Sequence, residues 1–281
     1  MNNPISFPLL GLEIDPKYGF SIGPLEIRYY ALCIAVGLIL AVVYALRRKK
    51  EFGLSEDDLL DGVLYIVPIA VVCARLYYCI FSWNSYKDDP LSILYIWHGG
   101  LAIYGGVIGA AVSIVVYTRL RKISLPAVLD ITALGFLIGQ CIGRWGNFFN
   151  REAYGGVTDL PWKMGIYIRG VLTYVHPTFL YESLWNLIGF LLLHFLSKKR
   201  KYDGQIALGY AAWYGFGRML IEGLREDSLY LGPIRISQAL AAVSFLAAMT
   251  VLIVLQFRPH DPENLFKNRV LSKNEPEEKA E

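Results

Sequence analysis

The sequence predicts an all-α integral membrane protein whose helices form a seven-span bundle. Hydrophobic residues make up 55% of the 281 residues, and the mean hydropathy of +0.41 is high for a soluble chain of this length. The apolar residues gather in segments long enough to cross about 30 Å of hydrocarbon as helices. We find no alternation of apolar and polar residues typical of membrane strands, so a helical bundle is the expected spanning form.

Seven apolar segments are long enough to serve as membrane helices. They are residues 27–46, 59–81, 101–117, 128–149, 177–196, 205–223 and 236–257. The N-terminal stretch lacks the basic residues that open a cleaved signal peptide, so we expect the first segment to remain as a span. We assign residues 1–258 to a seven-span domain and residues 259–281 to a charged, disordered tail.

Clustered lysines and arginines orient the predicted spans. The clusters follow the first, third and fifth segments, at residues 47–50, 119–122 and 198–201. All three lie on one side of the membrane if the N-terminus is outside, and the positive-inside rule assigns that side to the cytoplasm. The sequence therefore predicts an external N-terminus and a cytoplasmic C-terminal tail.

Polar residues in or beside the spans gather near the external side. They are Arg28, Tyr29, Tyr30, Arg75, His98, Tyr104, Arg144, Asn147, His176, Tyr181, Glu182, Tyr214, Arg218, Glu222, Arg225, Ser237 and Gln238. Independent structural residues would not segregate into one half of the bilayer. We therefore predict a single polar cavity in the outer half of the membrane.

One predicted helix carries a stripe of charged residues. Tyr214, Arg218, Glu222 and Arg225 are spaced i, i+4, i+8 and i+11, which places them on one face of a helix. Glu222 can therefore pair with either arginine. Such a stripe either fixes the packing of the helices or presents its surplus positive charge to a ligand.

Arg144 and Arg218 are the two candidate phosphate clamps. An arginine within a bilayer costs about 2.5–3.5 kcal/mol on insertion scales, so a chain that keeps one there usually has an anion for it to bind. A planar guanidinium group donates parallel hydrogen bonds and stays charged away from water. Asn147 shares a helical face with Arg144 and offers a neutral amide.

Several other chemistries find no support in the sequence. It contains no P-loop, no H-E-x-x-H or G-x-S-x-G motif and no Cys/His spacing typical of a metal site, so we predict no metal ligands. The basic runs are short flanks of spans rather than a nucleic-acid-binding face. Five glycines between residues 99 and 109 either permit close helix packing or leave room for a lipid headgroup.

Four ordered motifs resemble those of one known family, the prolipoprotein diacylglyceryl transferases. GRWGNFFNREAYG at residues 143–155 resembles the family signature. IRYYAL at 27–32, HPTFLYES at 176–183 and YGFGRMLIEGLRED at 214–227 are similar to further family motifs, in the same order. The resemblance covers residues 27 to about 238. Tyr30, Asn147 and Gly155 match family positions linked to function, and we expect Gly155 to permit a loop conformation.

The resemblance implies a reaction. The family transfers the sn-1,2-diacylglyceryl group of phosphatidylglycerol to the lipobox cysteine of a prolipoprotein, forming a thioether and releasing glycerol 1-phosphate. The implied partners are phosphatidylglycerol, the lipobox of a signal peptide and the bilayer of the bacterial cytoplasmic membrane. No cofactor is expected. In this reading Arg144 and Arg218 stabilise the leaving phosphate, and Glu222, Arg225 and Arg75 help to bind the lipid.

The base that deprotonates the thiol has several candidates. Some family members carry a histidine in an H-G-G-L-I-G segment, where this chain has YGGVIG with Tyr104 in the histidine's place. His98, also followed by two glycines, begins a second such stretch. The candidates are therefore His98, Tyr104 and Tyr214 beside Arg218, or a route in which the substrate assists.

Two other functions compete with the transferase. An anion or phospholipid transporter with an arginine-lined site would continue its polar residues into the cytoplasmic halves of the spans, where the sequence offers mainly Asp130, with Asp61 near one end. A structural membrane subunit would use its ion pairs only to hold the helices together. Residues 158–175 are a candidate lid over the cavity.

Overall fold

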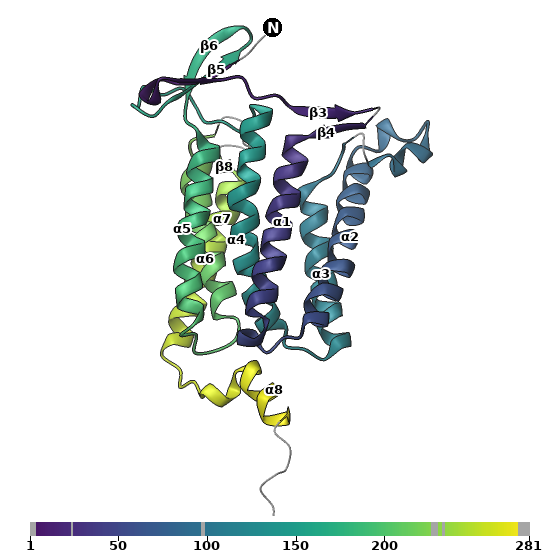
Figure 1. Cartoon of the computed structure of the whole chain (residues 1–281), viewed down its shortest axis with the longest axis vertical. Coiled ribbons are helices and arrows are strands. Elements are labelled where there is room, and N and C mark those ends of the chain that lie inside the picture. The colour runs from purple at the N-terminus through teal and green to yellow at the C-terminus, as the bar shows by residue number, and fades with distance from the viewer. Residues whose placement is uncertain (1–3, 24, 97–98, 226–229, 232–233, 275–281) are drawn as a thin grey trace, which may run out of the picture. The chain divides into compact units, whose positions relative to one another are not determined.

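The computed structural model describes residues 4–23, 25–96, 99–225, 230–231 and 234–274. It divides into two compact units, which are described separately. The first unit comprises Met1–Ala45 and Leu129–Leu265, and the second comprises Leu46–Val128 and Phe266–Glu281. A helix occupies each of the seven predicted segments, with ends that lie within a few residues of the prediction (Figure 1).

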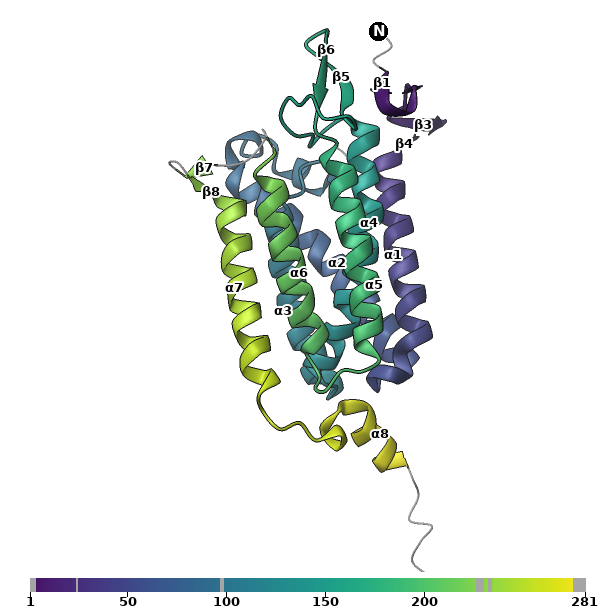
Figure 2. The same cartoon turned by 90° about the vertical axis from the view of Figure 1, so that its left-hand side faces the viewer.

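The first unit holds most of α1 (Tyr29–Arg48) and α4 (Leu125–Asn150), and all of α5 (Thr178–Ser197), α6 (Gln205–Glu222) and α7 (Ile236–Gln256). Helix α6 packs against both α5 and α7 (Figure 2). Glycines allow close approach between these helices. A Cβ atom added to Gly37 of α1 would lie 3.2 Å from the Cα atom of Gly139 in α4.

Two tryptophans join α5 to α6. The indole N–H of Trp185 donates to the carbonyl oxygen of Trp213 at 3.0 Å, and Trp213 returns the bond to Trp185 at 2.9 Å. Their rings stack with centroids 4.3 Å apart. Gly189 and Gly217 make room for these rings, because an added Cβ atom would lie 2.3 Å from Trp213 and 2.1 Å from Trp185, respectively. The pair therefore determines how α5 and α6 align.

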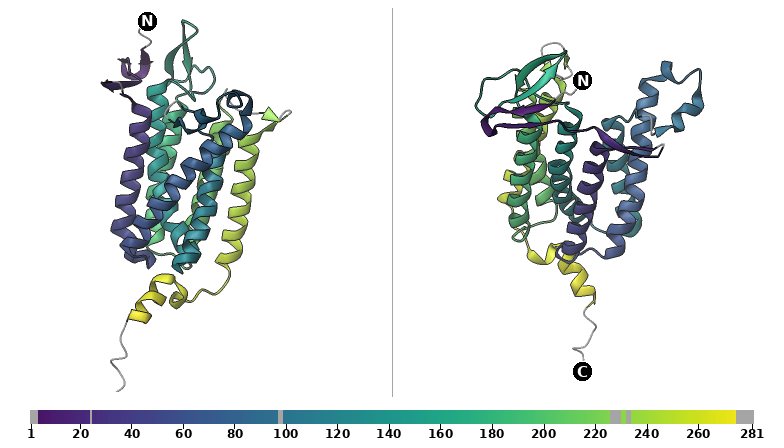
Figure 3. Two further views of the ribbon diagram at one scale, coloured as in Figure 1. Left: turned by 90° about the vertical axis from the view of Figure 1, so that its right-hand side faces the viewer. Right: turned by 45° about the horizontal axis from the view of Figure 1, so that its top comes forward.

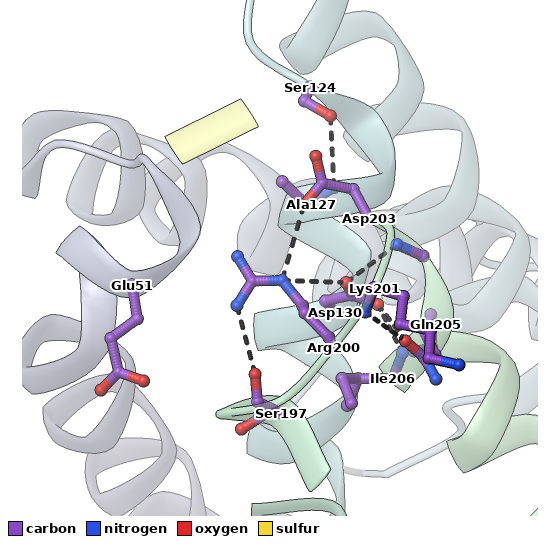
Figure 4. Close-up of polar contacts among 12 residues, drawn as sticks. Glu51, Ser124, Ala127, Asp130, Ser197, Arg200, Lys201, Asp203, Gln205 and Ile206 are labelled. Carbon is purple, nitrogen blue, oxygen red and sulfur yellow. Dashed lines mark hydrogen bonds and ion pairs between the residues drawn. The ribbon is translucent and has the colours of Figure 1, made fainter. Parts of the chain in front are cut away.

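Asp130 of α4 caps the first turn of α6 from a distant part of the chain. The residue at the N-cap position of α6 is Gly204, which has no side chain to offer. The buried carboxylate of Asp130 instead accepts backbone N–H groups of Gly204 at 2.8 Å and of Ile206 and Ala207 at 2.9 Å (Figure 4). These bonds satisfy donors that a helix start leaves without partners. The buried Arg200 lies 4.0 Å from the same carboxylate.

The second unit contains α2 (Glu56–Phe81) and α3 (Ile103–Arg121), joined through the short 3-10 helices η3 (Trp83–Ser85) and η4 (Pro90–Leu94). Ser55 caps α2 in a reciprocal arrangement with Asp58. Gly105 and Gly109 of α3 lie against α2, where added Cβ atoms would come within 2.5 Å of Cys73. These glycines therefore serve close helix packing, as one of the two sequence interpretations proposed.

The tail differs from the predicted disordered segment. Pro262–Asn264 forms the 3-10 helix η6, and Phe266–Asn274 forms helix α8. Helix α8 packs on the 3-10 helix η2 (Lys49–Phe52), and a Cβ atom on Gly53 would lie 2.7 Å from the backbone of Lys267. Charge alone was a poor guide here, because a short helix needs only a small apolar contact to be held in place.

The chain is mostly helical, as predicted, but it also contains short strands outside the long helices, which the sequence did not predict. A four-stranded antiparallel sheet has the order β2 (Leu12–Ile14), β1 (Ile5–Phe7), β5 (Met164–Ile168) and β6 (Val171–Val175). Two hairpins add β3 (Gly19–Ile22) with β4 (Leu25–Arg28), and β7 (Tyr230–Leu231) with β8 (Ile234–Arg235). The strands are too short for their alternation to stand out in the sequence, and β1 pairs with a strand far along the chain.

The sheet packs on the ends of α4 and α5. Its buried residues Ile5, Ile166 and Val175 form a cluster with Phe148 of α4 and Phe179 of α5. Figure 3 shows the purple N-terminal strands beside the hairpin of β5 and β6 at this end of the first unit. The candidate lid at residues 158–175 is thus largely a β-hairpin held in a sheet, and its mobility stays a prediction.

Six helices among the described residues are long and apolar enough to cross a membrane: α1, α2, α3, α4, α5 and α7. The predicted sixth span, α6, is not in this set, because it carries Arg218 and Glu222 and several glycines and tyrosines. The chain therefore has the helices of a multi-pass membrane protein. The count of seven spans remains a proposal.

Candidate active site

Arg144, Glu182 and Arg218 meet at one end of the first unit. Arg144 comes from the last turns of α4, Glu182 from the start of α5 and Arg218 from the second half of α6. Glu182 holds one arginine on each carboxylate oxygen, with Oε2 2.5 Å from Nη2 of Arg144 and Oε1 3.0 Å from Nη1 of Arg218. The two arginines proposed as phosphate clamps therefore share one buried carboxylate.

Glu222 and Arg225 extend this network. Oε2 of Glu222 lies 2.5 Å from Nη2 of Arg218 and 4.0 Å from Nε of Arg225, which confirms the pairing predicted from helical spacing. Nη1 of Arg225 lies 3.6 Å from Oε1 of Glu182. Three arginines thus surround two glutamates, and the network carries a formal charge of +1.

The acidic and the basic side chains of this network differ in their exposure to solvent. The side chains of Glu182 and Glu222 are only 4% and 3% exposed, whereas those of Arg144 and Arg218 are 21% and 17% exposed. The carboxylates lie beneath guanidinium groups that remain accessible. This arrangement fixes the arginines while leaving some of their N–H groups available to an anion.

Asn147 connects the network to the loop that follows α4. Its side-chain oxygen accepts a hydrogen bond from Nη1 of Arg144 at 3.3 Å, and its Nδ2 donates to Oε1 of Glu152 at 3.0 Å. Asn150 donates to the same oxygen of Glu152 at 3.2 Å. Asn147 and Arg144 are therefore brought together as the helical spacing predicted.

Tyr30 lies at the edge of the same region. Its ring packs on Gly146, where an added Cβ atom would lie 2.6 Å from the ring. Tyr30 is also within electrostatic range of both Glu152 and Arg144. Three of the four sequence motifs therefore converge here through Tyr30, Arg144 and Arg218, and the fourth contributes Glu182.

Gly155 serves close packing rather than an unusual backbone angle. Its φ is not positive, whereas Arg151 and Ala153 have φ values of 52° and 57°. The Gly155 N–H group donates to the carbonyl oxygen of His176 at 3.0 Å. An added Cβ atom would lie 2.7 Å from Cβ of His176 and 2.9 Å from the carbonyl oxygen of Leu224. The expected loop conformation is thus corrected to a tight junction of three segments.

Tyr214 lies one turn before Arg218, and its ring stacks on that of Tyr210 with centroids 5.7 Å apart. The Tyr210 hydroxyl accepts a hydrogen bond from Gln140 at 2.9 Å. His98 lies outside the described residues. Tyr104 belongs to the second unit, where its side chain at the start of α3 is 42% exposed.

Arg75 also belongs to the second unit, where it organises the chain before α3. Its buried guanidinium donates to the carbonyl oxygens of Ile93 at 2.8 Å and of Gly99 at 2.7 Å. It also donates to the carbonyl oxygens of Gly100, Ser92 and Tyr95. These backbone bonds use its donors within the loop, whereas the donors of Arg144 and Arg218 face side-chain carboxylates.

Sequence reasoning placed Glu182 among the polar residues of the predicted cavity, but it assigned a role in the site neither to Glu182 nor to Glu152. Both lie inside motifs that were singled out, and Glu182 lies within the apolar helix α5, where a buried carboxylate needs a partner. The partner could have been sought among the arginines of the neighbouring motifs. Among the residues with described positions, no group of three or more His, Cys, Asp or Glu side chains is arranged to hold a metal ion.

The arrangement suits binding of a phosphate group at a membrane. Two guanidinium groups on separate helices converge on one carboxylate, and a phosphate can take up the donors they leave accessible. A buried pair of glutamates keeps the geometry ready before the ligand arrives.

Comparison with known proteins agrees with this geometry. The family model described as prolipoprotein diacylglyceryl transferase matches residues 17–254. A phosphatidylglycerol–prolipoprotein diacylglyceryl transferase of Lysinibacillus sphaericus is 45% identical over 256 residues, which cover 87% of this chain and 93% of the relative. The enzymes of that name from Streptococcus suis and Enterococcus faecalis are 46% and 43% identical, over 88% and 95% of this chain and 94% of each relative. The chain therefore belongs to the prolipoprotein diacylglyceryl transferase family.

Proposed function

We propose that this protein transfers the diacylglyceryl group of phosphatidylglycerol to the lipobox cysteine of prolipoproteins in the bacterial cytoplasmic membrane. The network of Arg144, Glu182 and Arg218 carries the proposal, because it places two accessible cations at one end of apolar helices. Its formal charge of +1 matches the single negative charge of a phosphodiester. Membership in the family and 43–46% identity to enzymes of this name support the same activity.

The reaction increases the negative charge on the phosphate, and the two arginines are placed where they can stabilise the added charge. The cysteine sulfur attacks the glyceryl carbon that bears the phosphate, and a carbon–sulfur bond forms as the carbon–oxygen bond breaks. The electron pair of that bond leaves with the phosphate, so a singly charged diester becomes a glycerol phosphate that gains one charge. Arg144 and Arg218 stabilise this developing charge from fixed positions.

The acidic residues hold the arginines ready. Nη1 of Arg218 lies 3.0 Å from Oε1 of Glu182, and its Nη2 lies 2.5 Å from Oε2 of Glu222. Because the positions are set before the lipid binds, little reorganisation is needed when the carbon–oxygen bond breaks. Asn147, Tyr30 and Arg225 complete the proposed headgroup site. Gly155 maintains the junction beside it, and Arg75 positions the loop before α3.

The thiol proton goes to a base whose identity stays a prediction. Tyr214 is the candidate within the first unit, because it lies one helical turn from Arg218. Tyr104 and His98 are the candidates near the start of α3. A route in which the substrate phosphate accepts the proton is the remaining alternative.

The topology follows from the placement of charge in the first unit. The network lies at the C-terminal ends of α4 and α6 and the N-terminal end of α5. The basic run at residues 198–201 lies at the other end of α5. With that run in the cytoplasm, α6 is a span with the network in the outer half of the membrane. The lipid then enters sideways, and the signal peptide arrives from the outer leaflet.

Transport is less well supported. Asp130 was the main polar residue that a transporter could use in the cytoplasmic half, and its carboxylate is occupied by the N–H groups of α6. This capping role accounts for the burial of an aspartate here, so no ion pathway is needed to explain it. A purely structural role for the network predicts a loss of stability on mutation but no separate loss of activity.

The test uses purified protein, vesicles containing phosphatidylglycerol and a lipobox peptide. We expect glycerol phosphate release and a diacylglyceryl mass gain on the peptide. Arg144→Ala and Arg218→Ala should remove both signals while remaining folded. Arg119→Ala is the control, because Arg119 is exposed in the last turn of α3 and belongs to a basic run that the sequence assigns to the cytoplasmic side. Folded wild-type protein that releases no glycerol phosphate would overturn the proposal.

A further inference from the structure

A second basic site lies at the opposite end of the helices of the first unit. A cavity of about 320 Å³ is lined by Lys201, Arg258, His260 and Pro262. Lys201 comes from the connection between α5 and α6, and the other three follow the end of α7. Arg218 lies 13 residues beyond Gln205, the first residue of α6, which is about 20 Å along the helix, so the cavity and the arginine network lie near opposite ends of α6.

Two cations of this cavity are exposed and uncompensated. Neither the ammonium group of Lys201 nor the guanidinium group of Arg258 makes an ion pair with any residue whose position is described. Arg200, beside Lys201 in the chain, is instead buried against Asp130 and Asp203. The neighbouring basic residues therefore divide into one used for folding and two available to a ligand.

The wall of the cavity is held in place. The Nε2–H group of His260 donates to the carbonyl oxygen of Leu255 at 2.7 Å, and its ring stacks on Tyr202 with centroids 4.5 Å apart. Burial, with a smaller contribution from the charge of Asp130, raises the pKa of Tyr202, so its phenol stays neutral. Oδ1 of Asp261 accepts a hydrogen bond from the backbone N–H group of Glu263 at 3.0 Å.

An apolar surface adjoins these cations. Phe257, which immediately precedes Arg258, is 85% exposed at the end of an apolar helix. An exposed aromatic ring in that place suits the boundary between acyl chains and headgroups. A ligand that touches both features needs an apolar part and an anionic part, which is the chemistry of an anionic phospholipid.

We propose that this cavity binds the phosphate group of an anionic phospholipid in the leaflet opposite to the transfer site. Lys201 and Arg258 bind the phosphate, His260 and Pro262 form the wall, and Phe257 contacts the acyl chains. A free phosphate ion would bind the same two cations, but it would make no contact with the apolar surface. The choice of leaflet rests on the topology given under the proposed function, whereas binding at the cavity does not require transferase activity.

The test measures lipid binding to the full-length protein in detergent by native mass spectrometry. Phosphatidylglycerol, phosphatidylcholine and inorganic phosphate are titrated separately. We compare Lys201→Ala/Arg258→Ala with Lys198→Ala/Lys199→Ala, which removes two exposed cations from the same connection outside the cavity. Each cation near a lipid surface contributes about 1 kcal/mol, or about fivefold in affinity, so the cavity variant should lose more than about tenfold for phosphatidylglycerol.

The control variant should lose less than about twofold, and phosphatidylcholine should bind both variants like the wild type. Equal losses in the two variants, or no loss in either, would overturn the proposal, because binding would then follow total charge alone. Saturation by inorganic phosphate with no preference for the lipid would also overturn it. Glycerol phosphate release should persist in the cavity variant, so failure of this inference is distinguishable from failure of the proposed transferase activity.

Discussion

Replacing Glu182 with glutamine should destabilise the protein by about 3 kcal/mol. Removing one partner of a buried ion pair costs about 3–5 kcal/mol, because the remaining charge stays desolvated. Glu182 is 4% exposed and serves both Arg144 and Arg218, but these arginines retain 21% and 17% exposure. Water therefore offsets part of the loss, which places the expected value at the lower end of the range, about 3 kcal/mol.

The assay is chemical unfolding of the purified protein in detergent, with and without phosphatidylglycerol. A double-mutant cycle with Arg218→Ala should give a coupling energy of about 1–3 kcal/mol, since both residues belong to one network. Glu152→Gln is the matched control, because Glu152 is exposed and its described hydrogen bonds come from the neutral amides of Asn147 and Asn150. That control should change stability by less than about 1 kcal/mol.

Two results would refute this reasoning about Glu182. One is a loss below about 0.5 kcal/mol, which is the range of an ordinary surface substitution. The other is simple additivity with Arg218→Ala, which would mean that the two side chains do not share a network in the folded protein. Glu182→Gln protein that remains folded should also be less active, because Arg144 and Arg218 would lose their fixed positions.

Three further substitutions, one of them with a matched control, test other contacts. Asp130→Ala should cost about 1–2 kcal/mol in thermal unfolding, because it removes the cap on α6, and an unchanged midpoint would argue against that cap. Gly217→Ala should cost about 1–3 kcal/mol by overpacking against Trp185, 2.1 Å from the added Cβ atom. Gly139→Ala, whose Cβ atom would meet nothing within 4 Å, should be close to neutral in the same measurement. Gly155→Ala should reduce kcat more than it changes KM for phosphatidylglycerol, and a wild-type kcat would count against the tight junction at this loop.

The long helices could be predicted from local information. The predicted segments 205–223 and 236–257 differ from α6 (Gln205–Glu222) and α7 (Ile236–Gln256) by one residue each. A membrane helix satisfies its own backbone hydrogen bonds, so an apolar stretch of sufficient length carries its structure without distant partners. For the same reason, the pairing of Glu222 with Arg218 and Arg225 followed from spacing within one helix.

The strands could not be predicted in this way. Strand β1 pairs with β5 through Ser6 and Gly165, which are far apart in the sequence. Each strand has five residues or fewer, and its backbone groups need a partner that local composition does not identify. The same holds for Asp130, whose role depends on the absence of a side-chain cap on α6.

By itself, the sequence determined the helical segments and the family, because each depends on residues close together in the chain. Only the tertiary structure decided which charges meet. Glu182 became the shared partner of Arg144 and Arg218 because α4, α5 and α6 bring their ends together. Ion pairs between helices depend on distances of a few ångströms, and these are set by packing, here by the paired tryptophans of α5 and α6 and the cap from Asp130.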